Sequence, residues 1–350
     1  MERHRHLDRL RVISALAVVA IHVLGHYLNG FALKSRMWTV TMILKHATHF
    51  CIPVFFMISG ALLIRPLGEM TYRQYLKKRY ARIFFPFLVW SVVHWLVVVV
   101  AVQKKPLSVT EFFRLFLSNG ICSQYWYVYA TLILYLFLPF IGSLVSGISR
   151  NQLKTLIVIM AVVNLGFPFV NESLKMFTKW KLTNYNMSSM GAYLTYALIG
   201  YALHTMKLPA TGKRYMIYGS GIAAWVLMCV LCWINSVEKY TGTLAETQYP
   251  LAGIMGITVF VVVRAACEKR PAAHGGRLLR ILSAESYTAY LTHMLCLRLL
   301  QIPWKTDYVV SLGGPRVAAI MLAEWILGLI GCFGIAWLVH KLPKKISGIV

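Results

Sequence analysis

The sequence predicts an all-α integral membrane protein, a bundle of about ten transmembrane helices with both termini in the cytoplasm. The first observation is composition: 58% of its 350 residues are hydrophobic and 13% are charged, whereas a soluble domain carries about 25% charged residues. The second is that the apolar residues gather into runs as long as a membrane crossing. The third is that Lys and Arg lie mainly between these runs, where they mark the cytoplasmic side.

The apolar runs place the helices near residues 11–29, 45–64, 83–102, 124–145, 155–170, 188–205, 216–236, 250–266, 283–301 and 315–338. A crossing takes about 20 residues. The chain therefore has no room for a separate soluble domain, and we expect one transmembrane domain over residues 1–350. The basic stretch before the first run resembles the start of a signal peptide. We interpret the run as the first helix because it is as long as a full span and lacks a clear small-residue cleavage site.

Basic residues in alternate connections set the predicted orientation. The richer set holds Arg3, Arg5, Arg9, Arg11, Arg65, Arg73, Lys77, Lys78, Arg79, Arg82, Arg150, Lys154, Lys207, Lys213, Arg214, Arg264, Lys269, Arg270, Arg277, Arg280, Lys341, Lys344 and Lys345. The other set is about half as rich and holds Lys34, Arg36, Lys45, Lys104, Lys105, Arg114, Lys175, Lys179, Lys181, Lys239 and Lys305. The positive-inside rule puts the richer set in the cytoplasm. Both termini then lie inside, and residues 103–123 and 171–187 become outer loops.

Charge and cysteine content narrow the possible partners. The formal net charge of +25 would suit nucleic acid, but the basic residues flank apolar runs instead of forming one basic face. We therefore expect membrane lipids and anionic small molecules as partners, and no nucleic acid. The seven cysteines are odd in number and lie mostly inside apolar runs, so no disulfide framework is predicted.

A basic, amphipathic stretch over residues 65–82 is predicted to lie at the cytoplasmic membrane surface. Within it, Arg79 and Arg82 are separated by about one helical turn. They can converge on one phosphate group, which guanidinium groups bind well. From the residues alone, ordinary positive-inside flanking explains the two arginines better.

Ionisable residues inside the predicted helices are the strongest candidates for function, because each costs about 3 kcal/mol to place in a membrane. They are His22, His26, His94, His293 and Glu324, with Arg11 and His204 near cytoplasmic ends and Arg298 toward an outer end. Arg11 and His22 are separated by about three turns plus 20°, so they share one helix face, with His22 about 16 Å deeper. His22 can serve as a general base or as a hydrogen-bonded core histidine, and the spacing leaves both open.

His22 and His26 have the spacing of a metal-binding pair, but the sequence suggests no third ligand, so we expect no metal. Glu324 has no cationic neighbour in the surrounding stretch AAIMLAEWILGLIG. Its partner must come from another helix, and the candidates are His22, His94, His293 and Arg11. A structural ion pair and a catalytic orienting carboxylate both remain open.

Five stretches, taken in order, resemble motifs of the membrane-bound acyltransferase-3 superfamily. LDRLRVISALAVVAIH is similar to its Asp-x-Leu-Arg opening and its Arg-x10-His signature. CIPVFFMISGALL resembles its second-helix motif, and RYAR resembles its Arg-x-x-Arg motif. QYWYVYATLILYLFLPFI and ESYTAYLTHMLCL are similar to its Trp-Tyr helix and its late Ser-x-x-x-Tyr-Leu-x-His helix. The single-domain chain is most similar to the bacterial O-acetyltransferases of this superfamily.

The resemblance implies an enzyme of the bacterial cytoplasmic membrane that moves an acyl group, in the first instance acetyl, from cytoplasmic acyl-CoA. The acceptor would be a hydroxyl of a cell-surface glycan or a lipid-linked sugar. Arg11 and His22 would form the catalytic pair, with Arg79, Arg82 and Arg11 binding the anionic part of acetyl-CoA. Glu324 is a further candidate, as the orienting partner of His22, and an acyl-histidine intermediate is a variant mechanism.

Two positions depart from the superfamily pattern. Pro53 and Val54 stand where many polysaccharide acyltransferases carry Asp, and Gln124 stands where relatives often carry His. These departures leave the acceptor open. A proton-coupled transporter or flippase, in which buried histidines and Glu324 relay protons, is the alternative function. A membrane-sensing or assembly partner without chemistry is a third.

Overall fold

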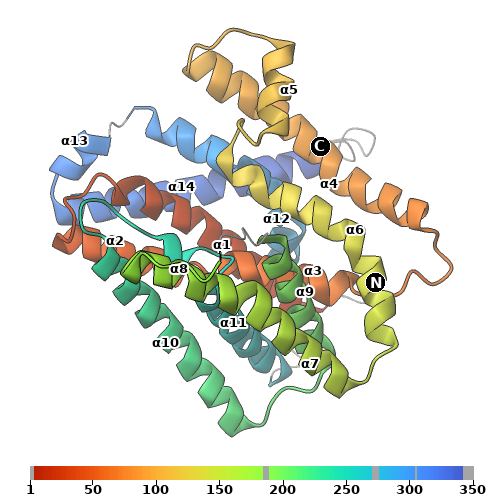
Figure 1. The fold of residues 1–350 in the computed structure, drawn as a ribbon. Helices are drawn as coiled ribbons and strands as arrows, with labels where there is room; N and C mark the ends of the chain where they lie inside the picture. The colour runs from red at the N-terminus through yellow and green to blue at the C-terminus, as the bar shows by residue number, and fades with distance from the viewer. Residues whose placement is uncertain (1–3, 184–188, 270–275, 304–305, 342–350) are drawn as a thin grey trace. The chain divides into compact units, whose positions relative to one another are not determined.

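The computed structural model describes residues 4–183, 189–269, 276–303 and 306–341, and the regular structure in these ranges is entirely helical (Figure 1). The all-α class is thereby confirmed. Some residues used in the predictions lie outside the described ranges. They are Arg3, Arg270, Lys305, Lys344 and Lys345, together with residue 188 at the start of one predicted helix.

The α-helices, labelled in Figure 1, are α1 (Arg5–Leu28), α2 (Arg36–Ala47), α3 (Cys51–Leu63), α4 (Tyr72–His94), α5 (Val109–Leu117), α6 (Trp126–Ser146), α7 (Arg150–Ala161), α8 (Phe167–Thr178), α9 (Ser189–Thr205), α10 (Thr211–Asn235), α11 (Pro250–Glu268), α12 (Arg277–Gln301), α13 (Thr306–Ser311) and α14 (Gly314–Lys341). Two π-helical segments extend this set. Trp95–Val102 continues α4, and Val162–Gly166 joins α7 to α8.

Seven helical segments of the described chain are long and apolar enough to cross a membrane. They are Arg36–Leu63, Tyr72–Val102, Ser123–Ser146, Arg150–Thr178, Thr211–Asn235, Thr243–Glu268 and Gly314–Lys341. The other three predicted spans correspond to α1, α9 and α12. The chain is thus a multi-pass membrane protein, whereas the count of about ten crossings and the cytoplasmic termini stay predictions.

The second predicted helix, residues 45–64, is two helices in the structure. α2 starts at Arg36, where the Ser35 side chain caps it by accepting a hydrogen bond from the Trp38 amide at 3.2 Å. The break over residues 48–50 follows from Pro53, whose ring would clash with the carbonyl four residues earlier in a continuous helix. In α3, Pro53 occupies the first turn, where a missing N–H costs no hydrogen bond.

Three other predicted segments also differ from the structure: one helix begins earlier, and two predicted loops contain helix. α4 begins at Tyr72 instead of residue 83, because Thr71 and Gln74 form a capping box at its start. The predicted outer loop 103–123 contains α5, which buries Phe112 and Phe116 on one face. Part of the predicted loop 171–187 continues α8.

The chain forms two compact units, one made of Met1–Pro66 with Leu138–Ser283, the other of Leu67–Phe137 with Ala284–Val350. In the first unit, α1 packs against α2, α3 and α11, while α10 runs beside α11 (Figure 1). α3 and α9 approach closely through glycines. A Cβ on Gly60 would lie 1.8 Å from the Ala197 carbonyl oxygen, and one on Gly200 would lie 2.0 Å from that of Met57. Only glycine permits this backbone contact.

In the second unit, tyrosine hydroxyls hold α4 against α6. Tyr72, Tyr75 and Tyr80 donate to the carbonyls of Leu136, Tyr135 and Leu132 at 3.0, 3.2 and 2.7 Å. Pro139 lies inside α6 and has no N–H to bond the carbonyl of Tyr135, four residues earlier. The Tyr75 hydroxyl supplies the missing donor.

Candidate functional site

Arg11 lies near the start of α1 and is anchored by an acidic neighbour. Its Nη1 is 3.5 Å from Oδ1 of Asp8, and the Asp8 side chain is only 8% exposed. Ser283 donates a hydrogen bond to the same carboxylate oxygen at 2.6 Å. The carboxylate therefore positions the guanidinium of Arg11, whose side chain keeps 32% of its surface exposed. Asp8 stood in the opening motif of the sequence, but its role depends on Ser283, which no local pattern pairs with it.

His22 follows Arg11 along α1 by about three turns and is half-buried inside the first unit. Because α1 is a continuous helix from Arg5 to Leu28, the shared face predicted for Arg11 and His22 holds in the structure. The next turn carries Gly25, where a Cβ would lie 3.6 Å from Cε of Lys45. The Lys45 side chain of α2 thus lies beside α1 one turn beyond His22, in the direction away from Arg11.

Three histidines meet at the start of α1. Nε2 of His6 lies 3.1 Å from Nδ1 of His204 on α9, and the rings of His4 and His204 contact edge to face at 4.5 Å. Within the described residues, no group of three or more His, Cys, Asp or Glu side chains has the geometry to hold a metal ion. The structure therefore pairs His204 with another histidine rather than with a carboxylate.

Arg79 and Arg82 lie one turn apart on α4 in the second unit. Arg79 is half-buried, and its guanidinium carbon is 5.9 Å from the centre of the Tyr75 ring. Arg82 is exposed. Because the Tyr75 hydroxyl is bonded to α6, the ring that supports Arg79 is itself held in place. The two guanidinium groups lie on neighbouring turns of α4, one of them half-buried and the other exposed to solvent.

The second unit contains two buried histidines, His94 and His293, of which His94 lies close to Tyr125. His94 is 1% exposed, and its ring centre is 5.8 Å from that of Tyr125. Neither ring nitrogen of His94 has a hydrogen-bond partner among the described residues. His293 contacts the carbonyl of Tyr290 through Nδ1. The membrane-cost argument identified both histidines, and the structure buries both.

Glu324 is 5% exposed on α14 and accepts a hydrogen bond from Nε2 of Gln301 at 3.2 Å. The expected partners were the cationic or titratable groups His22, His94, His293 and Arg11. This hydrogen bond comes from an uncharged amide at the end of α12, a residue type that was not among the candidates. The four candidate partners stay predictions.

A polar cluster of the first unit was not identified from the sequence. Nζ of Lys45 donates to the hydroxyl of Tyr240 at 2.8 Å. The ring of His46 is 4.8 Å from that of His49 and 6.4 Å from that of Tyr240. Burial raises the pKa of Tyr240 well above its ordinary value, so the hydroxyl keeps its proton and can still donate. We call these four residues the Lys45 cluster.

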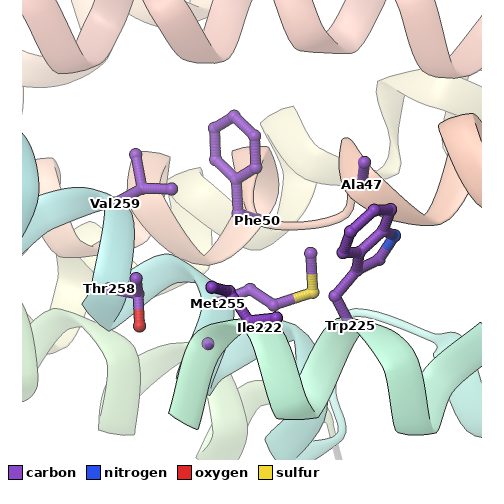
Figure 2. A pocket seen from close by; sticks show the side chains of 8 residues that line it. Ala47, Phe50, Ile222, Trp225, Met255, Thr258 and Val259 are labelled. Carbon is purple, nitrogen blue, oxygen red and sulfur yellow. The ribbon is translucent and has the colours of Figure 1, made fainter. Parts of the chain in front are cut away.

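A cavity of about 200 Å³ opens between α10, α11 and the junction of α2 with α3. Figure 2 shows Phe50, Met255 and Trp225 gathered around it. The polar atoms of its wall are already bonded, since Thr258 donates to the Ile217 carbonyl and the Trp225 indole donates to the Ile43 carbonyl. Its lining therefore suits hydrocarbon and offers no group for proton transfer.

Comparison with known proteins gives one match. A family model described as an acyltransferase domain, acyltransferase type 3, matches residues 4–341. No curated protein and no solved structure matches the chain significantly. The matched range covers most of both units and contains all the side chains described above.

Proposed function

Because the chain belongs to the acyltransferase-3 family, we propose that it is an O-acyltransferase that uses cytoplasmic acetyl-CoA or another acyl-CoA. The acceptor is a hydroxyl of a cell-surface glycan or a lipid-linked sugar, and the location is the bacterial cytoplasmic membrane. The family supports a membrane acyltransferase with an acyl donor and an acceptor. The identity of both substrates is our proposal.

The observation that carries the proposal is the arrangement along α1. A buried carboxylate, Asp8, holds the guanidinium of Arg11 at 3.5 Å. His22 lies on the same helix face, about 16 Å further along. That separation allows an anionic group held near Arg11 to belong to the same extended donor molecule as an acyl thioester at His22.

His22 acts in this mechanism as the general base. It accepts the proton of the acceptor hydroxyl as the hydroxyl oxygen attacks the carbonyl carbon of the thioester. The carbon–sulfur bond then breaks, and the leaving thiolate of CoA takes the proton from His22. The chain thereby returns to its starting protonation state.

The remaining proposed residues bind or orient. Arg79, Arg82 and Arg11 are each proposed as phosphate-binding residues, because guanidinium groups pair with phosphate through two hydrogen bonds each. Glu324 stays a proposed catalytic residue. Gln301, which donates to Glu324 at 3.2 Å, then fixes the direction of that carboxylate.

The test replaces His22 with Ala and measures transfer of labelled acetyl groups from acetyl-CoA to the glycan and lipid fractions of membranes. We expect a fall of at least about 100-fold, the usual contribution of a general base. His26→Ala is the matched control, since His26 is one turn away on the same helix and packs against Tyr27. Near-normal transfer by well-folded His22→Ala protein would overturn the proposal.

A further inference from the structure

Lys45 is a basic residue inside a helical segment that is long and apolar enough to span a membrane. It lies within the span Arg36–Leu63, and no carboxylate is within ion-pair distance of it in the described part of the chain. Its contacts are the Tyr240 hydroxyl at 2.8 Å and the Tyr240 ring at 4.4 Å. A charged side chain inside a membrane is costly. The presence of Lys45 there therefore indicates a function, such as binding a ligand or transferring a proton.

His46 gives an independent indication of a missing partner. The residue is 0% exposed, and neither of its ring nitrogens has a hydrogen-bond partner among the described residues. A neutral imidazole has one donor and one acceptor, and leaving both unsatisfied in a buried position destabilises the fold. By contrast, His49 is satisfied locally, since its Nδ1 contacts the Lys45 carbonyl at 3.0 Å.

The break between α2 and α3 explains why these groups converge. The chain turns at residues 48–50, and the Lys45 carbonyl accepts from the Thr48 hydroxyl at 2.6 Å. This turn places His49 back against His46, with ring centres 4.8 Å apart. Tyr240 then arrives from the segment after α10, where Ser236 accepts from the Thr241 amide at 2.9 Å and shapes the turn.

The cluster also lies close to the proposed catalytic base. A Cβ added to Gly25, which is one helical turn beyond His22, would lie 3.6 Å from Cε of Lys45, so the Lys45 side chain lies beside this part of α1. Arg11 lies in the opposite direction along the same helix. A molecule approaching His22 from the Lys45 end would therefore meet the thioester from the side away from the donor's anionic end.

We propose that the Lys45 cluster is a subsite for an anionic group, phosphate or carboxylate, carried by the acceptor. The inference rests on the proposed function, because it takes His22 as the place of transfer. Lys45 supplies the charge, Tyr240 a hydroxyl donor, and His46 a ring N–H for a second oxygen. The anionic group holds the acceptor so that its hydroxyl reaches His22.

The experiment uses the full chain in nanodiscs of phosphatidylcholine and measures thermal stabilisation by three probes: glucose 1-phosphate, glucuronic acid and uncharged glucose. We expect one or both anionic sugars to raise the unfolding temperature and glucose to leave it unchanged. Lys45→Met, which keeps the length of the side chain, should weaken the anionic sugar about tenfold or more. Lys45→Arg keeps the positive charge and should retain most of the binding. If Lys45 served only in packing, the two substitutions would not differ in this way.

Each other outcome overturns the inference. Equal stabilisation by glucose, or an anion effect that survives in Lys45→Met, places the binding elsewhere. If phosphatidylglycerol added to the nanodisc stabilises the protein through Lys45 while neither sugar does, the cluster belongs to a bilayer lipid. Acetyl-CoA is tested on every variant: if it stabilises them all and the anionic sugars do not, only the acceptor subsite fails. If acetyl-CoA stabilises none, the proposed function fails as well.

Discussion

In the first unit, α3 and α9 touch backbone to backbone, whereas in the second unit α4 meets α6 through tyrosine hydroxyls. Gly60 and Gly200 make the first contact possible, because any Cβ there would occupy the place of a main-chain oxygen. Tyr72, Tyr75 and Tyr80 make the second by donating to carbonyls of α6. The first interface depends on glycines, which have no side-chain atoms, and the second depends on the hydroxyl groups of tyrosine side chains. They should therefore respond very differently to small substitutions.

The largest effect is expected for Gly60→Ala. Its Cβ would lie 1.8 Å from the Ala197 carbonyl oxygen, so α3 and α9 must separate. We expect a loss of about 3 kcal/mol or more in the free energy of unfolding, or failure to accumulate folded protein. Gly219→Ala on α10 is the control, because nothing lies within 4 Å of its added Cβ. Equal melting temperatures for the two variants would show that the close contact of the first unit does not exist.

Asp8→Asn should have the next largest effect, and it tests positioning rather than packing. The amide can still accept the hydrogen bond from Ser283 but loses the charge that faces Arg11 at 3.5 Å. We expect a rise of about tenfold in KM for acetyl-CoA with a smaller change in kcat. Ser283→Ala is the control, since it removes the hydroxyl and leaves the ion pair. A fall in kcat alone would assign Asp8 to another step.

A smaller effect is expected for Tyr75→Phe in the second unit. The substitution removes one hydroxyl and leaves the Tyr135 carbonyl without its donor, at a cost of about 1 kcal/mol. Thermal unfolding of the purified protein measures the change. Tyr308→Phe on α13, an exposed tyrosine, is the matched control. A loss as large as that of Gly60→Ala would remove the contrast between the two units.

The smallest effect concerns the surface of α5. Arg114 donates two hydrogen bonds to Glu111, at 2.7 and 2.6 Å, and these hold the pKa of Glu111 below its ordinary value. A depressed carboxyl pKa stabilises the fold above the unfolded-state pKa, and this contribution is lost as the pH falls through the folded-state value. Arg114→Gln should therefore lower the melting temperature slightly at pH 7 and leave it unchanged below the pKa of the carboxyl group, so that this acid-side dependence disappears. The effect at pH 7 is small because water screens the exposed Arg114 side chain. A large shift at pH 7 would contradict the assignment.

Helix content and much of the α1 site could be predicted from the sequence, because both depend on local spacing. The apolar runs located every long helix, and the positions of Arg11 and His22 followed from helix geometry. The predicted helix boundaries were wrong where a single side chain determines the start or the end of a helix. Pro53 splits the second predicted helix, and the capping box at Thr71 extends α4.

The parts of the site that sequence reasoning missed depend on partners distant in the chain. Ser283 reaches Asp8, and Tyr240 reaches Lys45, across separations that no periodicity encodes. Gln301 escaped notice for a different reason, since the search for partners of Glu324 considered only charged or titratable groups. Lys45 itself was counted only as a charge near an outer loop.

The contact of α3 with α9 also constrains the order in which the protein folds during synthesis. α3 leaves the ribosome early, but its partner helix is made only after residues 67–137, which belong to the other unit, have been synthesised. Until then, the face of α3 around Gly60 lacks the helix that covers it in the folded protein. Residues 67–137 of the second unit must therefore be synthesised before α3 can pack against α9. A translational pause before α9 would prolong the time that α3 spends without this partner.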